Sequence, residues 1–268
     1  MGELVFVGLG LFDENDVSLR GLKETETADY VFAEFYTSLM AGLSLERLEK
    51  KVGRKVTIVT RKTLEEENGE LILHKAANMK VVFLVSGDPL IATTHVDLRV
   101  RAEKRGIKTS VVHGTSIVSA AMGDSGLQNY RFGRSVTVPL PEGGVVSETP
   151  YNVVGENRAR DLHTLCFLDI KAEKKLFMTV REALEILLSI EKEKQKHAIT
   201  LDNIAVGLAR VGAKDEVVKA DRVKALLGFD FGSPPHILVF PAPRLHFMEA
   251  EALISLAGAP EHVNELVG

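Results

Sequence analysis

The sequence predicts an α/β protein with two α/β domains, each built on a mainly parallel or mixed sheet. Short apolar runs alternate with longer amphipathic runs along both halves of the chain, as in proteins that alternate strands and helices. The 268 residues, 45% of them hydrophobic and 26% charged, suffice for two compact cores. Proline and glycine break the pattern in "RFGRSVTVPLPEGG", so we place the boundary near residue 133, between domains 1–133 and 134–268.

Strands of the first domain are predicted from five apolar runs, which are "LVFVGLG", "DYVFAEF", "KVTIVT", "VVFLVSG" and "KTSVVHG". Helices are predicted between them, over residues 15–27, 44–52, 63–78 and 92–105. The run "VVFLVSG" has almost no polar alternation, which is typical of a strand covered on both faces in a parallel sheet. The helix over 92–105 ends in basic residues and Gly106, both favoured at a helix C-terminus.

The second domain resumes the alternation after the small, alanine-rich stretch "HGTSIVSAAMGDSG" and the predicted boundary. Its strands are predicted from the runs "SVTVPLP", "HTLCFLDI", "NIAVGLARVG" and "HILVFPAP". Its helices are predicted over residues 179–195, 217–227 and 246–258.

Composition narrows the class of protein. A net charge of −4 indicates neither a nucleic-acid footprint nor a polybasic membrane surface. No basic leader is visible, and no apolar run approaches the roughly 18 residues of a membrane span, so we expect a soluble, cytoplasmic protein. The one cysteine, Cys166, lies in an apolar run and is expected to be a buried hydrophobe. That cysteine and eight scattered histidines give no zinc-site spacing, so no metal site is expected.

The first predicted strand runs into a glycine turn, "VGLGLFDENDVSLRGL", with Gly8 and Gly10 before a helix capped by Asp13 or Asp16. The nicotinamide fingerprint G-x-G-x-x-G begins in this way, and Glu34 after the next strand can imitate its ribose-binding carboxylate. Asp13 occupies the position of the third glycine, and a carboxylate there repels pyrophosphate. A plain tight turn stays open as the alternative. The P-loop and the G-x-S-x-G motif are both absent from the sequence.

A second turn, Gly-Asp-Pro, follows the strand "VVFLV". Asp88 as an N-cap with Pro89 at the first helical position is one interpretation, an ordinary helix start. The other is a ligand loop, because Thr115 and Ser116 in "HGTSI" also follow a strand. In an open α/β sheet such loops border one crevice beyond the carboxyl ends of the strands.

These motifs make the sequence recognisable. It resembles the diphthine synthases, methyltransferases of diphthamide biosynthesis within the tetrapyrrole-methylase-like class of S-adenosylmethionine enzymes. The resemblance covers nearly the whole chain and rests on the runs "VGLGLFDENDVSLRGL", "EFYTSLM", "SGDPLIATTH", "TSIVSA", "FLDIKAEK" and "FGSPPHILVFPAPRLHF". It implies two α/β domains that bind S-adenosylmethionine, S-adenosylhomocysteine as product, a homodimer, and translation elongation factor two as the protein substrate. The methyl acceptor implied is the amine of a 3-amino-3-carboxypropyl group on a histidine of that factor.

The resemblance also implies which residues bind the cosubstrate, namely Leu11, Asp88, Ile91, Ser116 and Ile117 from the first domain, and Leu168, Val211 and His236 from the second. Without it, the apolar members of this set are interpreted as core residues that offer only backbone groups. Asp88 and His236 are candidates to take a proton from the amine, but loss of that proton to water suffices, so no catalytic residue is assigned. The sequence departs from the family pattern in "HGTSI", "AAMGDSGL" and "PAPRLHF".

Three alternatives stay open. A tetrapyrrole (porphyrinoid) methyltransferase of the same fold is the first, although "EFYTSLM" favours the diphthine synthases. A non-catalytic module that binds S-adenosylmethionine or the elongation factor is the second, since methyl transfer needs no diagnostic nucleophile. A nicotinamide dehydrogenase is the weakest, because it lacks the third glycine. The number of methyl groups transferred is left open.

Overall fold

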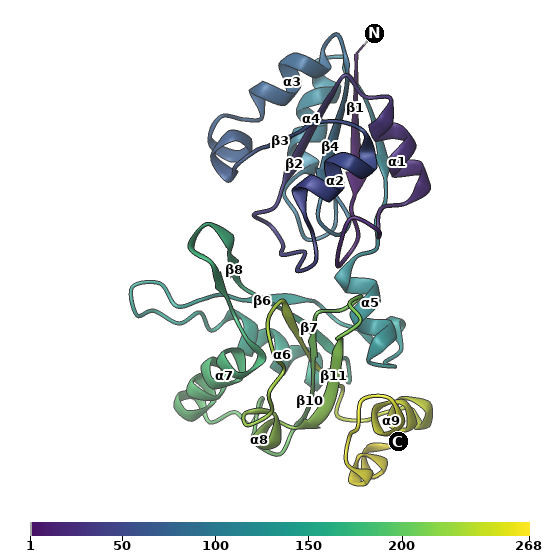
Figure 1. Ribbon diagram of the computed structural model, residues 1–268. Coiled ribbons are helices and arrows are strands. Elements are labelled where there is room, and N and C mark those ends of the chain that lie inside the picture. The colour runs from purple at the N-terminus through teal and green to yellow at the C-terminus, as the bar shows by residue number, and fades with distance from the viewer. Residues whose placement is uncertain (1) are drawn as a thin grey trace. The chain divides into compact units, whose positions relative to one another are not determined.

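The computed structural model describes residues 2–268 and divides the chain into two compact units (Figure 1). Unit 1 comprises the chain up to residue 117 together with 172–175, and unit 2 comprises 118–171 and 176–268. The predicted α/β class is confirmed, with one sheet of five strands in each unit. The boundary predicted near residue 133 lies just before the first strand of the second sheet and stays a prediction.

The sheet of unit 1 is entirely parallel, with strand order β3-β2-β4-β1-β5. Its strands are β1 (Glu3–Gly8), β2 (Tyr30–Glu34), β3 (Val56–Ile58), β4 (Lys80–Val85) and β5 (Lys108–Val112). In the register of the sheet, Gly8 and Glu34 both lie beside Val85. The carboxyl ends of β1, β2 and β4 therefore meet at one edge, which we call the carboxyl edge of unit 1.

Helices cover both faces of this sheet (Figure 1). They are α1 (Leu19–Glu26), α2 (Leu45–Val52), the π-helix η1 (Lys62–Glu66), α3 (Glu70–Ala76) and α4 (Val96–Lys104). From β1 to β3 the chain moves towards one side of the sheet, and from β3 to β5 it moves back. Right-handed crossovers then put α1 and α2 on one face and α3 and α4 on the other. A separate apolar core forms on each face. The helix predicted over 63–78 is interrupted because Asn68 and Gly69 have positive φ angles.

The sheet of unit 2 is mixed, with order β11-β10-β12-β7-β6, and only β6 and β7 run parallel. Its strands are β6 (Val136–Val138), β7 (Thr164–Leu168), β10 (Ile204–Ala209), β11 (Val217–Arg222) and β12 (His236–Phe240), and a small hairpin joins β8 (Ile170–Lys171) to β9 (Leu176–Phe177). The remaining helices are α5 (Ile117–Asp124), α6 (Thr149–Ala159), α7 (Val180–Lys194), α8 (Val223–Leu226) and α9 (Phe247–Ser255), with 3₁₀ turns η2 (Asn129–Arg131), η3 (Ala172–Lys174) and η4 (Glu261–Leu266). One apolar core packs α6 and α7 onto this sheet.

The helix predicted over 217–227 is wrong in its first half. Residues 217–222 form β11, which pairs with β10 along its whole length, and only α8 is helical. Lysine, alanine and arginine favour a helix locally, but pairing with a central strand overrides that preference. Helix α6, which begins with Pro150 in its first turn, was not predicted.

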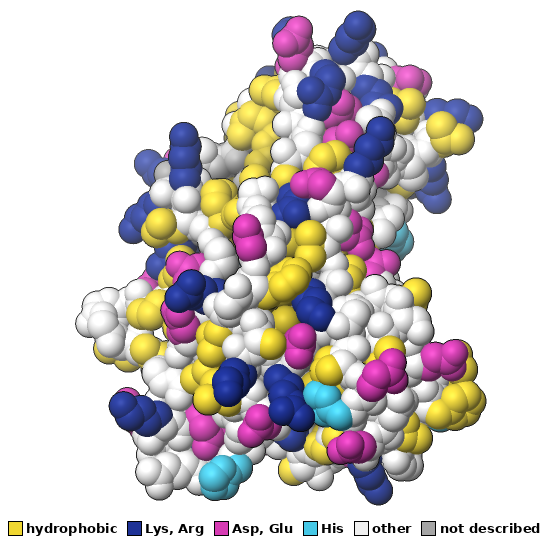
Figure 2. Space-filling model, turned by 60° about the horizontal axis from the view of Figure 1, so that its bottom comes forward, with side chains coloured by type: hydrophobic (Ala, Val, Ile, Leu, Met, Phe, Trp, Pro, Cys, Tyr) yellow, Lys and Arg dark blue, Asp and Glu magenta, His cyan; other side chains and the backbone are white. Residues whose placement is uncertain are grey.

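The surface carries both signs of charge. On the face drawn in Figure 2, lysine and arginine side chains are interspersed with aspartate and glutamate. Across residues 2–268, the structure has no helix long and apolar enough to span a lipid bilayer.

Candidate functional site

Glycines bring three loops into backbone contact at the carboxyl edge of unit 1. Gly10 donates to the carbonyl of Gly87 (3.3 Å), and Gly87 donates to the carbonyl of Gly10 (2.7 Å). A Cβ atom added to Gly8 would lie 2.5 Å from the amide nitrogen of Gly114 and 2.5 Å from the carbonyl oxygen of Gly87. Gly10, with φ of +88°, also adopts a backbone conformation that other residues rarely reach. The glycine turn and Gly-Asp-Pro therefore form one backbone cradle, built from these four glycines.

Topology explains why the cradle forms here. Strands β1 and β4 are neighbours, yet β1 leads to α1 on one face of the sheet and β4 leads to α4 on the other. Chains that diverge from adjacent strand ends leave a crevice between them, and open α/β sheets bind ligands at this position. The prediction that these loops meet at one edge is confirmed.

Asp88 does not start a helix, because α4 begins at Val96. Its Oδ1 accepts a hydrogen bond from the amide of Leu90 (2.9 Å), and its Oδ2 lies 2.7 Å from Nδ1 of the exposed His113. The carboxyl group itself is buried. The interpretation of Gly-Asp-Pro as an ordinary helix start is therefore wrong, and the loop instead presents a buried acid beside the cradle.

Of the other four residues assigned to unit 1, Leu11, Ile91 and Ser116 lie in loops after the strands, and Ile117 begins α5. The amide of Leu11 donates to Oδ2 of Asp16 (3.1 Å), so Asp16 stabilises the glycine turn. The N-cap of α1 is Ser18, and the prediction of Asp13 or Asp16 as the cap is wrong. Ile91 is exposed, and Ser116 directly precedes Ile117, the first residue of α5.

Leu168, Val211 and His236 lie at one edge of the sheet in unit 2. Leu168 ends β7, His236 begins β12 opposite Ala209, and Val211 follows two residues after Ala209. The side chains of Leu168 and Val211 are buried in the unit, which leaves only their backbone groups for a ligand.

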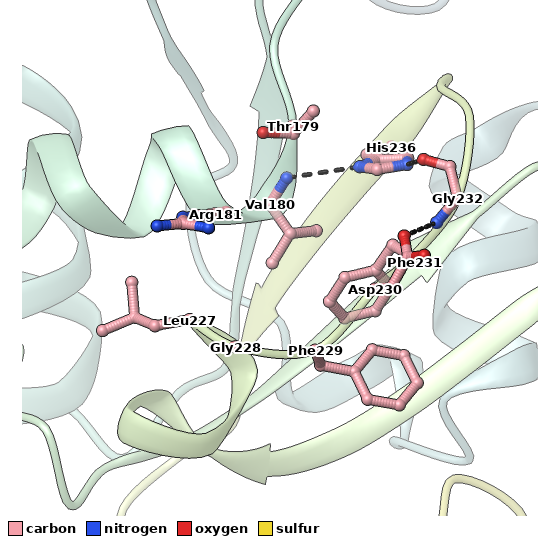
Figure 3. A pocket seen from close by; sticks show the side chains of 10 residues that line it. All are labelled: Thr179, Val180, Arg181, Leu227, Gly228, Phe229, Asp230, Phe231, Gly232 and His236. Atoms are coloured by element: carbon pink, nitrogen blue, oxygen red, sulfur yellow. Dashed lines mark hydrogen bonds between the residues drawn. The ribbon is translucent and has the colours of Figure 1, made fainter.

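Both ring nitrogens of His236 are engaged (Figure 3). Its Nδ1 accepts from the amide of Val180 (3.3 Å), so Nε2 carries the proton and donates to the carbonyl of Gly232 (3.2 Å). Burial lowers the pKa of the imidazole, which keeps the ring neutral. The ring borders a pocket of about 280 Å³ that the N-terminus of α7 and the loop 227–232 enclose, with the rings of Phe229 and Phe231 on one wall.

Arg210 fixes the loop before His236, a role that the sequence did not indicate. Its buried guanidinium donates to the carbonyls of Phe231 (2.7 Å), Ser233 (2.6 Å) and Asp215 (2.8 Å), and to Oδ2 of Asp215 (2.7 Å). The backbone amide of Arg210 donates to the carbonyl of Pro235 (2.9 Å). One side chain thus holds the segment that leads into β12.

Glu34 is committed to a buried network at the carboxyl edge of unit 1. Its carboxylate accepts from the amides of Tyr36 and Thr37 and from the Thr37 hydroxyl, and lies 3.1 Å from Nε2 of the buried His95. Burial alone would raise the pKa of Glu34, but hydrogen bonds from His95 and Thr37 lower it below its usual range. With its acceptor positions filled, Glu34 does not suit the ribose-binding role of a dinucleotide enzyme. Among the side chains that the structure describes, no group of three or more His, Cys, Asp or Glu residues is placed to hold a metal ion.

Comparison with known proteins agrees with the fold. The family model of tetrapyrrole (corrin/porphyrin) methylases matches residues 3–227. A curated diphthine synthase of Methanococcoides burtonii is 51% identical over 267 residues, which cover 98% of each chain. One of Methanosarcina barkeri is 50% identical over 262 residues, 96% of this chain and 97% of the relative. A crystal structure of diphthine synthase superposes with a TM-score of 0.90 at 43% identity, over 99% of this chain and 100% of that chain.

Proposed function

Because the chain belongs to the tetrapyrrole methylase family and, within it, to the diphthine synthases, we propose that it methylates translation elongation factor two. The acceptor is the amine of the 3-amino-3-carboxypropyl group on the modified histidine, and the product is diphthine. The enzyme is an S-adenosylmethionine-dependent methyltransferase. The single observation that carries this function is full-length similarity to diphthine synthases, in a chain whose fold is theirs.

The cradle suits S-adenosylmethionine. Gly8, Gly10, Gly87 and Gly114 let the loops pack closely beside Asp88, whose buried carboxylate adds a negative charge. This charge favours a sulfonium cation and disfavours the pyrophosphate of a dinucleotide. The residues we propose as contacts are Leu11, Asp88, Ile91, Ser116, Ile117, Leu168, Val211 and His236.

The chemistry asks little of the side chains. When bound, S-adenosylmethionine supplies a methyl group that the sulfonium already activates, so the protein contributes orientation and exclusion of water. The acceptor amine must be neutral to attack. Both nitrogens of His236 and both oxygens of Asp88 are engaged in hydrogen bonds, which supports loss of the amine proton to water rather than to either side chain. We therefore give Asp88 and His236 binding roles.

A homodimer in the cytoplasm is proposed from the family resemblance. No membrane or nucleic-acid partner is proposed, in keeping with the net charge of −4.

A methyl-transfer assay tests the function. Purified protein receives labelled S-adenosylmethionine and elongation factor two that carries the amino-carboxypropyl histidine, with unmodified factor as control. We expect label on the modified factor only. If calorimetry shows that S-adenosylmethionine binds but no label moves, the acceptor is wrong, and porphyrinoid acceptors become the next to assay.

A further inference from the structure

Two buried hydroxyl groups lack hydrogen-bond partners. Within residues 2–268, the buried side-chain polar atoms without a partner are Oη of Tyr36 and Oγ of Ser86, in residues only 7% and 4% exposed. Such groups are rare in folded proteins because burial without a partner costs free energy. Tyr36 follows β2 and Ser86 follows β4, whose last residues Glu34 and Val85 lie side by side. Both hydroxyls therefore belong to the carboxyl edge of unit 1, where the cradle also lies.

A weakly paired cation lies against Tyr36. The guanidinium carbon of Arg61 is 5.1 Å from the centroid of the Tyr36 ring. Its acidic neighbour, Glu65, approaches only to 3.8 Å, and the Arg61 side chain is 54% exposed. An exposed pair of this length contributes little to stability. Arg61 is therefore a positive charge that an anion from solution can reach.

Buried hydrogen bonds hold the loop that carries Tyr36 in place. Glu34 accepts the amide of Tyr36 (3.0 Å), and His95 lies against the same carboxylate while its ring packs edge-on against Phe83 (centroids 5.1 Å apart). Burial, with the charges of Glu34 and Glu65, raises the pKa of the Tyr36 phenol. The phenol stays protonated and is available as a hydrogen-bond donor.

We propose that Tyr36 and Arg61 form a subsite for the carboxylate of the 3-amino-3-carboxypropyl group. This inference rests on the proposed function, and it adds the residues that recognise the acceptor. A guanidinium and a phenolic hydroxyl are both donors that match a carboxylate. The acceptor amine shares a carbon with that carboxylate, so holding one places the other. The subsite follows β2 and β3, next to the strands β4 and β1 that carry the cradle.

S-adenosylmethionine also has a carboxylate, in its methionine part, so the experiment must distinguish the two sources. We compare Tyr36→Phe and Arg61→Gln with the unaltered protein. Arg101→Gln is the matched control, because Arg101 is also an exposed arginine of unit 1 with an acidic neighbour four residues away, Asp97. Each protein is assayed for its KM towards the modified elongation factor and, by calorimetry, for its Kd for S-adenosylmethionine.

We expect both subsite variants to raise the KM for the factor about tenfold or more, the usual effect of losing a hydrogen bond to a charged group. The Kd for S-adenosylmethionine and all constants of Arg101→Gln should be unchanged. Tyr36→Phe should not lower the melting temperature, because its hydroxyl has no partner to lose. A weaker Kd for S-adenosylmethionine in Arg61→Gln, with an unchanged KM for the factor, would assign the subsite to the cosubstrate and overturn the proposal.

Synthetic peptides that carry the modified histidine, as free acid or as primary carboxamide, give a second readout as inhibitors. The unaltered protein should prefer the acid about tenfold, and Arg61→Gln should not distinguish the two peptides. If Arg61→Gln still prefers the acid peptide about tenfold, or if the acid peptide does not inhibit the parent protein, the subsite is contradicted. Failure of the proposed function looks different, because the unaltered protein would then bind S-adenosylmethionine and label no elongation factor.

Discussion

The edges of the two sheets differ in whether their buried polar groups have hydrogen-bond partners. At the carboxyl edge of unit 1, the hydroxyls of Tyr36 and Ser86 are buried without partners. At the edge of unit 2 that begins β12, Arg210 donates four side-chain hydrogen bonds and both nitrogens of His236 are used. A saturated edge is held rigid by its own bonds, whereas an unsaturated edge leaves polar groups for a ligand. The two edges thus differ in whether the fold itself satisfies the hydrogen-bonding groups buried beside them.

Replacing Arg210 should have the largest effect on stability. Arg210→Met leaves the carbonyls of Phe231 and Ser233 without donors and frees the segment before His236. We expect the free energy of unfolding to fall by about 3 kcal/mol or more, measured in urea at pH 7. Arg181→Met is the control, because Arg181 is exposed and pairs with Glu185 on the surface, so its loss should change stability by less than about 1 kcal/mol. Equal effects of the two substitutions would remove the contrast between the edges.

A buried acid makes the stability of unit 2 depend on pH. Burial alone would raise the pKa of Glu249, but hydrogen bonds from His163 and from the amides of Gln128 and His246 lower it to about 2. Nδ1 of His163 accepts from the amide of Ala242 (2.8 Å), which places its proton on Nε2, facing Glu249.

A lowered carboxyl pKa stabilises the fold above the unfolded value, near 4.5, and this contribution is lost as the pH falls towards about 2. The loss should approach about 3 kcal/mol, since one pKa unit corresponds to about 1.4 kcal/mol. Unfolding of the parent and of Glu249→Gln, measured between pH 7 and pH 2.5, checks this. The variant should be less stable at pH 7 and should depend less on pH in the acid range, and parallel curves would contradict the assignment.

Asp88→Asn tests whether the carboxyl edge of unit 1 binds the cosubstrate through charge. Asparagine keeps an acceptor for the amide of Leu90, so the loop should survive while the negative charge is lost. We expect the Kd for S-adenosylmethionine to rise about tenfold in calorimetry. Asp97→Asn, on the exposed surface of α4, should leave the affinity unchanged. An unchanged affinity in Asp88→Asn would show that the cradle binds through its backbone alone.

Sequence patterns were reliable where one strand and the loop after it carry the information. The apolar run before Gly-Asp-Pro is β4, and the run before the glycine turn is β1, so the cradle was predictable from strand ends. Strand β11 was missed because its pairing with β10 is invisible in local residue preferences. Helix α6 was missed as well, because proline, asparagine and glycine in "TPYNVVGENRA" obscure its pattern.

The contacts that distinguish the two edges depend on tertiary structure. Arg61 meets Tyr36 only because β3 pairs with β2, and no spacing in the sequence states that pairing. Arg210 contacts carbonyls more than twenty residues further along the chain, and an arginine in "ARVG" has no local mark of burial. Residue types indicate which groups are available, but only the fold shows which of them remain unpaired.

Ser86→Ala should have the smallest effect on stability and gives the contrast its sharpest test. A buried hydroxyl without a partner costs about 1–3 kcal/mol, so its removal should leave the free energy of unfolding unchanged or raise it by up to about 1 kcal/mol. Ser125→Ala is the matched substitution in unit 2, where an equally buried hydroxyl donates to the carbonyl of Met122 (3.1 Å). Its removal should lower stability by about 1 kcal/mol.

The free energy of unfolding is measured in urea at pH 7. A rise in Ser86→Ala and a fall in Ser125→Ala would show that the carboxyl edge of unit 1 holds polar groups at a cost in stability. Methyl transfer should then fall in Ser86→Ala but not in Ser125→Ala, since only the first hydroxyl lies beside the cradle. If Ser86→Ala lowers stability as much as Ser125→Ala, its hydroxyl has a partner inside the fold, and the unsaturated edge reduces to Tyr36 alone. Such a hydroxyl, harmful to the fold and needed for turnover, is expected where a site is preorganised for a ligand.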